Sequence, residues 1–259
     1  MIDVDGLLLD LEGTVAVSGG EIPGAATALR ALRDAGIPFR FATNSTGATR
    51  AHLAEWLGQR GIDVEAEEIV TAPLATAAYL RANHPGARCL LLGEGGAAAD
   101  LEGIDLVADD ADGADVVIVA GADAAYTWEH LNRAFRLLLD GAALVAMHRN
   151  LAWRTEEGMT LDSGAFVVGL ERAAGVEAVV VGKPSPDFFS RALELLGLPA
   201  RRAAMVGDDL DNDVLAAQAV GLTGVLVRTG KFRPGVLERT SVEPDHVIDS
   251  VAHLPDLLT

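Results

Sequence analysis

The chain has 259 residues, half of them hydrophobic, so it can form the core of one large domain or of two modest ones. Its formal net charge of −18 argues against nucleic acids and anionic membranes as partners. No apolar run is long enough to cross a bilayer, the N-terminus lacks the basic start of a signal peptide, and the single cysteine, Cys89, has no internal disulfide partner. We therefore expect a cytoplasmic protein.

Strands and helices alternate along the first part of the chain. Strands are predicted at 2–10, 37–42 and 67–70, and helices at 24–35, from Ser45 or Thr46 to about Gly61, and at 73–83. This order favours a parallel sheet with right-handed crossovers.

A second α/β unit is predicted to begin near His84. Its expected elements are strands at 88–92, 115–120 and 143–147, helices at 127–139 and 163–174, and a polar loop at 148–158. The first unit is predicted to resume near Ala178, with strands at 179–181, 203–206, 223–227 and 246–248 and helices at 187–196, 213–220 and 250–258. The expected fold is α/β: a doubly wound, Rossmann-like parallel-sheet core (1–83 and 178–259) interrupted by an inserted α/β cap (84–177).

Polar side chains follow four of the predicted core strands. They are Asp10 and Glu12, Thr43 and Asn44, Lys183, and Asp208, Asp209 and Asp213. Taken singly, each group has a structural explanation, as a helix cap, a surface lysine or an acidic turn. The carboxyl ends of parallel strands share one edge of a sheet, however, so we expect these groups to converge.

Phosphoryl transfer to an aspartate is the chemistry that such a set suits. Clustered carboxylates repel each other unless a cation lies between them, and their hard oxygens favour Mg²⁺. The metal would orient a phosphate for attack by Asp10. Lys183 and the Thr43-Asn44 pair would hold the equatorial oxygens, where transition-state charge collects. A water would then hydrolyse the aspartyl-phosphate.

The constellation resembles the haloacid dehalogenase superfamily, whose four motifs are D-x-D-x-T, a strand-end Thr or Ser, a Lys, and G-D-x-x-x-x-D. In this chain they are Asp10-Leu11-Glu12-Gly13-Thr14, Thr43, Lys183 and the segment from Gly207-Asp208-Asp209 to Asp213. The insertion between the second and third motifs is similar to the α/β cap of the NagD-type, 4-nitrophenylphosphatase-like branch.

The resemblance implies a role for each residue of the set. Asp10 is the expected nucleophile, and the metal ligands are the carboxylates of Asp10 and Asp208 and the main-chain carbonyl of Glu12. The resemblance also implies that Asp209 and Asp213 support the waters of the metal and Lys183. It is compatible with a homodimer formed through the caps.

One position departs from the family pattern, because Glu12 stands where the second aspartate, the general acid/base, is usual. The main-chain carbonyl is unaffected, so metal binding should survive. The longer side chain could misplace the proton-transferring group, and about 1 Å of misplacement can cost ~100-fold in rate. A catalytically weak or inactive phospho-ligand-binding, regulatory protein is therefore the alternative function. A dehalogenase is less favoured, because dehalogenation needs no metal.

The loop at 148–158 is the candidate for substrate contact within the cap. Arg149 and Arg154 could meet an anionic leaving group, and Trp153 could stack on a ring. The alternative is a solvated loop with one anchoring aromatic residue. The substrate is expected to be small and phosphorylated, with sugar phosphates, nucleotides, pyrophosphate and phosphoamides all open.

Overall fold

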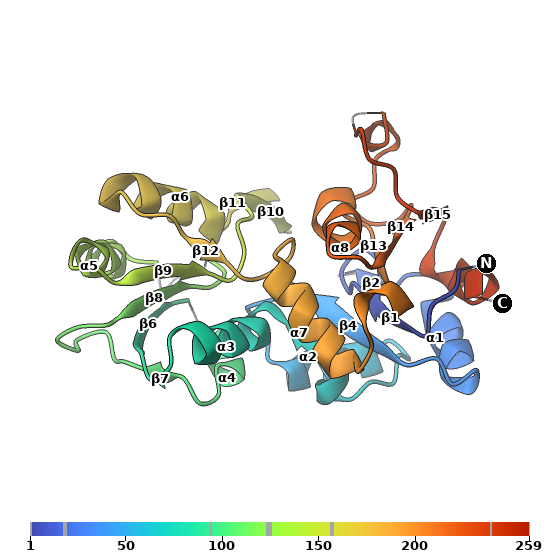
Figure 1. The fold of residues 1–259 in the computed structure, drawn as a ribbon, viewed down its shortest axis with the longest axis horizontal. Helices are drawn as coiled ribbons and strands as arrows, with labels where there is room; N and C mark the ends of the chain where they lie inside the picture. Colours follow the sequence, from blue (N-terminus) through green and yellow to red (C-terminus); the bar gives the residue numbers. More distant parts are fainter. Residues whose placement is uncertain are drawn as a thin grey trace. The chain divides into compact units, whose positions relative to one another are not determined.

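The computed structural model describes residues 2–17, 20–93, 95–122, 126–155, 158–238 and 240–258, without the side chains of residues 95 and 153–155. The described chain forms two compact units (Figure 1). Unit 1 comprises Met1–Thr43, Arg50–Val70 and Lys183–Thr259, and unit 2 comprises Asn44–Thr49 and Thr71–Gly182. In Figure 1 unit 1 is mainly blue and orange to red, and unit 2 is mainly green to yellow.

Unit 1 is built on a six-stranded sheet with the order β15-β14-β13-β1-β4-β5. The pairs from β15 to β4 are parallel. The strands are β1 (Gly6–Leu9), β4 (Phe39–Thr43), β5 (Ile69–Thr71), β13 (Ala203–Gly207), β14 (Thr223–Val227) and β15 (His246–Ile248). All four residues of β1 are buried, as expected for a central strand covered on both faces.

Helices cover both faces of this sheet. Leu7 and Leu9 join α1 (Ala25–Asp34) and the C-terminal α9 (Leu254–Leu258) in one apolar core. That core contains no residue of α7 (Pro186–Leu196), which contacts β1 and β4. Because side chains alternate along a strand, α7 covers the opposite, Leu8 face. The remaining helical elements of the unit are α2 (Arg50–Gly58), η1 (Ala66–Glu68), η2 (Ala200–Arg202), η3 (Leu210–Leu215), α8 (Ala216–Ala219), η4 (Pro234–Val236) and η5 (Val251–His253).

Unit 2 contains a parallel five-stranded sheet with the order β12-β9-β8-β6-β7. Its strands are β6 (Arg88–Leu92), β7 (Asp105–Leu106), β8 (Val116–Val119), β9 (Ala143–Ala146) and β12 (Val179–Val180). Its helices are α3 (Ala72–Asn83), α4 (Gly95–Asp100), α5 (Trp128–Leu139) and α6 (Ser163–Ala174). This unit has an apolar core of its own, to which the sheet, α5 and α6 contribute. The predicted α/β architecture with an inserted α/β segment is confirmed.

The return to the core differs from the sequence prediction. The predicted strand at 179–181 was assigned to the core sheet, but β12 pairs with β9 through Val179↔Val145 and Val180↔Ala146. The chain re-enters unit 1 at Lys183, and α3 lies in unit 2. A two-residue apolar strand satisfies the edge of either sheet equally well, so hydrophobic pattern alone cannot assign it.

Two short antiparallel hairpins lie outside the two larger sheets. One pairs β2 (Ala16–Val17) with β3 (Gly20–Glu21), and the other pairs β10 (Ala152–Thr155) with β11 (Gly158–Leu161). The second replaces much of the predicted polar loop at 148–158. In β11 the polar Thr160 alternates with Met159 and Leu161, and the hairpin is a separate ribbon rather than part of a sheet that covers a core. None of the described helices has both the length and the apolar character needed to span a bilayer.

Candidate active site

Asp10 lies one residue beyond the C-terminal end of β1. Its backbone N–H donates to the carbonyl of Val206 at 2.9 Å, which continues the β1–β13 pairing and fixes where the side chain emerges. The residue is 7% exposed, and the Thr14 hydroxyl donates to its Oδ2 at 3.5 Å. Burial raises the pKa of Asp10, although the charge of Lys183 opposes the rise.

Lys183 joins two of the acidic groups within unit 1. Its Nζ donates to Asp10 Oδ1 at 2.6 Å, to Asp213 Oδ1 at 2.6 Å and to the carbonyl of Ala42 at 2.8 Å. Burial would lower the pKa of Lys183, but the charges of Asp10 and Asp213 outweigh burial and raise it. The ammonium group therefore stays charged, and it compensates part of the buried negative charge.

The second acidic group begins where β13 ends. Asp208 follows Gly207, and Asp209 caps η3 by accepting the Asn212 backbone N–H at Oδ1, 3.1 Å away. Asp213, which lies within η3, accepts a hydrogen bond from the Asp209 N–H at Oδ2, 3.2 Å away. A Cβ at Gly207 would overlap the Asp213 carboxylate, so this close packing requires glycine.

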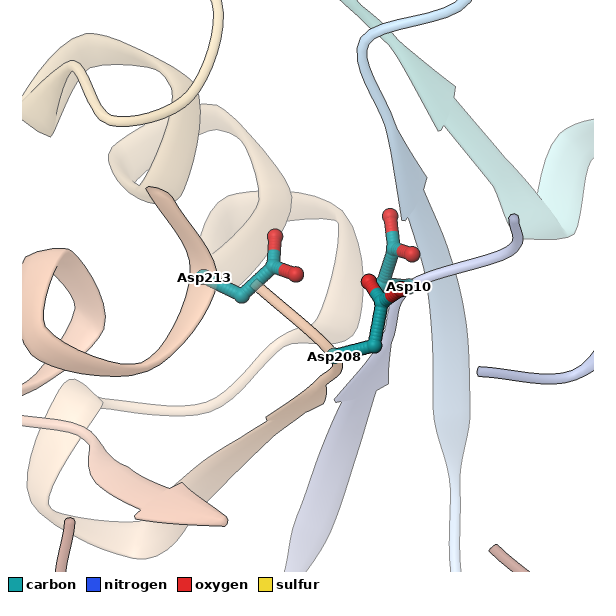
Figure 2. A group of neighbouring side chains, drawn as sticks. All are labelled: Asp10, Asp208 and Asp213. Carbon is teal, nitrogen blue, oxygen red and sulfur yellow. The ribbon is translucent and has the colours of Figure 1, made fainter. Parts of the chain in front are cut away.

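Three carboxylates from these segments form one cluster. Asp10, Asp208 and Asp213 each offer an oxygen within 4.8 Å of the others, and all three residues are buried (Figure 2). Burial raises the pKa of Asp208 to about 6 and that of Asp213 to about 7, although Lys231 and Lys183 respectively oppose these rises. One buried lysine does not balance three ionised carboxylates, so the cluster suits a cation.

The donor chemistry fits Mg²⁺. Oxygens bound to one Mg²⁺ lie about 3–4 Å apart, so a small approach of the side chains would complete a set of ligands. Both oxygens of Asp213 already accept hydrogen bonds, from Lys183 and from the Asp209 N–H. Asp213 therefore suits a supporting position better than a direct ligand position.

The other predicted site residues lie as follows. Thr43 ends β4, the neighbour of β1, and is buried in unit 1, whereas Asn44 is the first residue of the next segment of unit 2. Glu12 is exposed and forms an isolated bridge with Ala16.

Of the three cap side chains predicted to contact the substrate, the structure describes that of Arg149. In unit 2 the Arg149 guanidinium donates through Nη1 to Glu171 Oε1 at 3.0 Å and through Nη2 to Glu171 Oε2. The side chains of Trp153 and Arg154 lie outside the described residues.

Sequence reasoning missed the part that the segment after β14 plays at this site. The backbone N–H of Lys231 donates to Asp208 Oδ2 at 2.6 Å, and its Nζ lies 3.1 Å from Asp209 Oδ2. Burial would raise the pKa of Asp209, but hydrogen bonds from Asn212 and the charge of Lys231 lower it. The scarcity of lysine was an available signal, because the chain has only Lys183 and Lys231.

Comparison with known families identifies the family to which the chain belongs. Residues 7–107 match a family model described as haloacid dehalogenase-like hydrolase, and residues 180–254 match a second, HAD-hydrolase-like model. The chain is 37% identical over 250 residues to human haloacid dehalogenase-like hydrolase domain-containing protein 2, covering 96% of this chain and 94% of that protein. The protein belongs to the haloacid dehalogenase-like hydrolase family.

Further relatives and solved structures carry phosphatase names. Mouse phospholysine phosphohistidine inorganic pyrophosphate phosphatase is 35% identical over 98% of this chain and 94% of its own length. A p-nitrophenyl phosphatase from Archaeoglobus fulgidus has a TM-score of 0.91 and 31% identity over 99% of this chain and 100% of that chain. NagD from E. coli K-12 has a TM-score of 0.88 and 28% identity over 97% of this chain and 98% of that chain. These structures extend the likeness over both units.

Proposed function

We propose that this protein is a Mg²⁺-dependent phosphatase that hydrolyses a small phosphorylated molecule through an aspartyl-phosphate on Asp10. The observation that carries the proposal is the buried Asp10, held by Lys183 and lying within 4.8 Å of the acidic oxygens of Asp208 and Asp213. The phosphatase names of relatives similar over nearly the whole chain support turnover over a purely phospho-ligand-binding role.

The reaction needs two displacements at phosphorus. An Asp10 oxygen attacks the phosphorus, the bond from phosphorus to the leaving oxygen breaks, and Glu12 supplies the proton that the leaving oxygen takes. Water then attacks the aspartyl-phosphate, its proton passes to Glu12, and the Asp10 carboxylate is regenerated with release of phosphate. Lys183 keeps Asp10 ionised and, with Thr43 and Asn44, stabilises charge on the phosphoryl oxygens.

A bound Mg²⁺ would neutralise the phosphate and orient it in line with the attacking oxygen. The carboxylates of Asp10 and Asp208 and the main-chain carbonyl of Glu12 would hold it. Asp209 and Asp213 would orient its waters and Lys183. This assignment agrees with the engagement of both Asp213 oxygens by other donors.

The inserted segment is proposed to determine the substrate specificity, and Arg149, Trp153 and Arg154 are the proposed substrate contacts. The cytoplasm remains the proposed location, because the buried, unpaired thiol of Cys89 suits a reducing compartment. A homodimer formed through the inserted segments also remains a proposal.

The test is phosphate release from 4-nitrophenyl phosphate and a panel of small phosphorylated metabolites, with Mg²⁺ and with EDTA. We expect Mg²⁺-dependent turnover in the wild type and none in Asp10→Asn. Rapid acid quenching followed by mass spectrometry should detect a phosphorylated peptide containing Asp10. Asp34→Asn, an exposed change on α1, is the matched control and should behave as wild type. A wild type that binds Mg²⁺ but releases no phosphate from any compound, while Glu12→Asp does, would instead support the binding role.

A further inference from the structure

The segment Thr229-Gly230-Lys231, called here the 229–231 segment, follows β14 and contacts two parts of the proposed metal site. The Thr229 hydroxyl donates to the carbonyl of Gly13 at 2.5 Å. The Lys231 backbone N–H donates to Asp208 Oδ2 at 2.6 Å. One short segment, remote in sequence from both partners, is thus hydrogen bonded to the loop after β1 and to the carboxylate after β13.

The packing between these parts leaves no room for side chains. Gly13 has φ +86° and Gly230 has φ +55°. A Cβ at either glycine would overlap Asp208 Oδ2, and a Cβ at Gly230 would also meet the Cα of Gly13. The Asp208 carboxylate is therefore enclosed by two glycine backbones, and Asp208 is only 2% exposed.

The hydrogen bond from Lys231 defines the orientation of this carboxylate. Among the residues that the structure describes, the Lys231 N–H is the one hydrogen-bond donor to Asp208. It engages Oδ2 and leaves Oδ1 for a cation. A backbone donor cannot rotate away as a side chain can, so the carboxylate is oriented before a ligand arrives.

Thr229 acts on the other part of the site. Gly13 follows Glu12, whose carbonyl is a proposed ligand, and Gly13 N–H itself donates to the Ala16 carbonyl at 2.8 Å. The Glu12 carbonyl and the Gly13 N–H share one peptide plane, which the hydrogen bond to Ala16 holds. The Gly13 carbonyl belongs to the next peptide, which Thr229 holds from outside the loop. With both peptides around Gly13 held, its two backbone torsions are restrained, and so is the direction of the Glu12 carbonyl.

We propose that the 229–231 segment positions the metal site, with Thr229 orienting the Glu12 carbonyl through Gly13, and with Gly230 and the Lys231 N–H orienting Asp208. The inference rests on the proposed Mg²⁺ site and extends it to three positioning residues that touch neither substrate nor metal. The Lys231 side chain is not part of this proposal, because its Nζ is exposed and pairs with Asp209.

Isothermal titration of the EDTA-stripped protein with MgCl₂ alone tests the inference without relying on turnover. Thr229→Val removes the hydroxyl at nearly constant volume and should weaken Mg²⁺ binding about 10-fold, within the 10–100-fold range typical of residues that orient metal ligands. Thr229→Ser keeps the hydroxyl and should bind Mg²⁺ within about 3-fold of wild type. Restoration by serine separates a positioning role from a loss of packing.

Gly230→Ala should weaken Mg²⁺ binding at least as much as Thr229→Val, since a Cβ there displaces Asp208. Gly36→Ala is the matched control, because Gly36 has φ +71° with nothing within 4 Å of the added Cβ. It reproduces the backbone strain without the steric overlap and should leave Mg²⁺ affinity unchanged.

The outcomes separate this inference from the proposed function. A wild type that binds Mg²⁺, together with Thr229→Val and Gly230→Ala proteins that bind it equally well, overturns the positioning role and leaves the phosphatase proposal standing. A wild type that shows no Mg²⁺ binding overturns both. A Thr229→Ser protein as weak as Thr229→Val would also contradict the inference, because the hydroxyl would then not be the group that matters.

Discussion

Lys183 shows how one side chain can decide both charge balance and stability. It lies 4% exposed between the Asp10 and Asp213 carboxylates, each 2.6 Å from its Nζ. A buried ion group of this kind is strongly destabilised when one partner is removed, because the remaining charges keep their desolvation cost without compensation. The residue therefore belongs to the folding of unit 1 as much as to its chemistry.

Lys183→Met should lower the free energy of unfolding by about 3–5 kcal/mol at pH 8. The loss should be smaller at pH 5, because Asp10 and Asp213 can then take up protons instead of remaining charged in the interior. Urea denaturation at the two pH values measures this. Lys231→Met is the control, since its exposed ion pair contributes only about 0.2–1 kcal/mol. Equal losses in the two variants would contradict the role given to Lys183.

Glu12 is the residue whose chemistry departs from the family pattern, and it is exposed beside a buried aspartate. We expect Glu12→Gln to lower kcat by about 100-fold or more, since general acid–base catalysis contributes 10²–10⁴-fold. Mg²⁺ affinity should stay within about 2-fold, because the proposed ligand is the main-chain carbonyl. Steady-state kinetics and Mg²⁺ titration test the two halves of this prediction. Glu67→Gln, another exposed acid, should match wild type in both, and an unchanged kcat in Glu12→Gln would remove Glu12 from the mechanism.

At the scale of the elements, Glu171 on α6 forms hydrogen bonds with residues at the end of β9 and just before β12. Glu171 on α6 accepts from Arg149, which follows β9, and its Oε1 also accepts the Ala178 N–H at 2.9 Å, just before β12. This arrangement links the end of β9, from which the hairpin β10–β11 departs, to the start of β12. It also means that an Arg149 engaged with a substrate would have to share its guanidinium with Glu171.

Arg149→Met should raise KM several-fold with little change in kcat if the proposed substrate contact is correct, because the interaction would be made equally in the ground and transition states. Glu171→Gln keeps the Arg149 charge while weakening the ion pair, so it should not raise KM. Kinetics on the best substrate from the panel, with melting temperatures of both variants, make the comparison. Lower melting temperatures in both variants with unchanged KM would assign Arg149 a purely structural role.

For the whole molecule, the acidic cluster makes stability depend on pH and on metal. Burial raises the pKa of Asp208 to about 6 and of Asp213 to about 7 in the folded protein, against 3.8 for an ordinary aspartate. Between about pH 4 and 7 the folded state therefore holds more protons than the unfolded state, and stability falls as pH rises through that window.

The melting temperature in EDTA should accordingly fall between pH 5 and pH 8, and the increase caused by Mg²⁺ should be larger at pH 8, where the carboxylates are ionised. Saturation at 100 times Kd stabilises the state that binds by about 2.7 kcal/mol. Calorimetry with and without Mg²⁺ at both pH values measures the effect. Asp213→Asn should flatten the EDTA profile, and an equally steep profile in that variant would show that the surface charge, rather than the cluster, is responsible.

Much of the architecture could be predicted from the chain. Buried strands such as β1 and β13 carry apolar runs that end in a polar residue, and α5 is amphipathic along its length. The hairpin β10–β11 could not be predicted, because a short ribbon outside the main sheets has no apolar face that the pattern must match. The sheet to which β12 belongs was predicted wrongly for the related reason that two valines fit an edge in either unit.

The sequence by itself determined the alternating α/β order, the insertion and the residue types of the candidate site, because periodicity and strand-end chemistry are local properties. Only the tertiary structure decided which groups meet. Lys183 reaches Asp10 and Asp213 although the strand before it lies in the sheet of unit 2. The 229–231 segment donates hydrogen bonds to Asp208 and to Gly13, and Gly13 lies more than 200 residues earlier in the chain. Such contacts depend on strand order and on glycine backbones that allow close approach, and neither is encoded in the neighbourhood of any one residue.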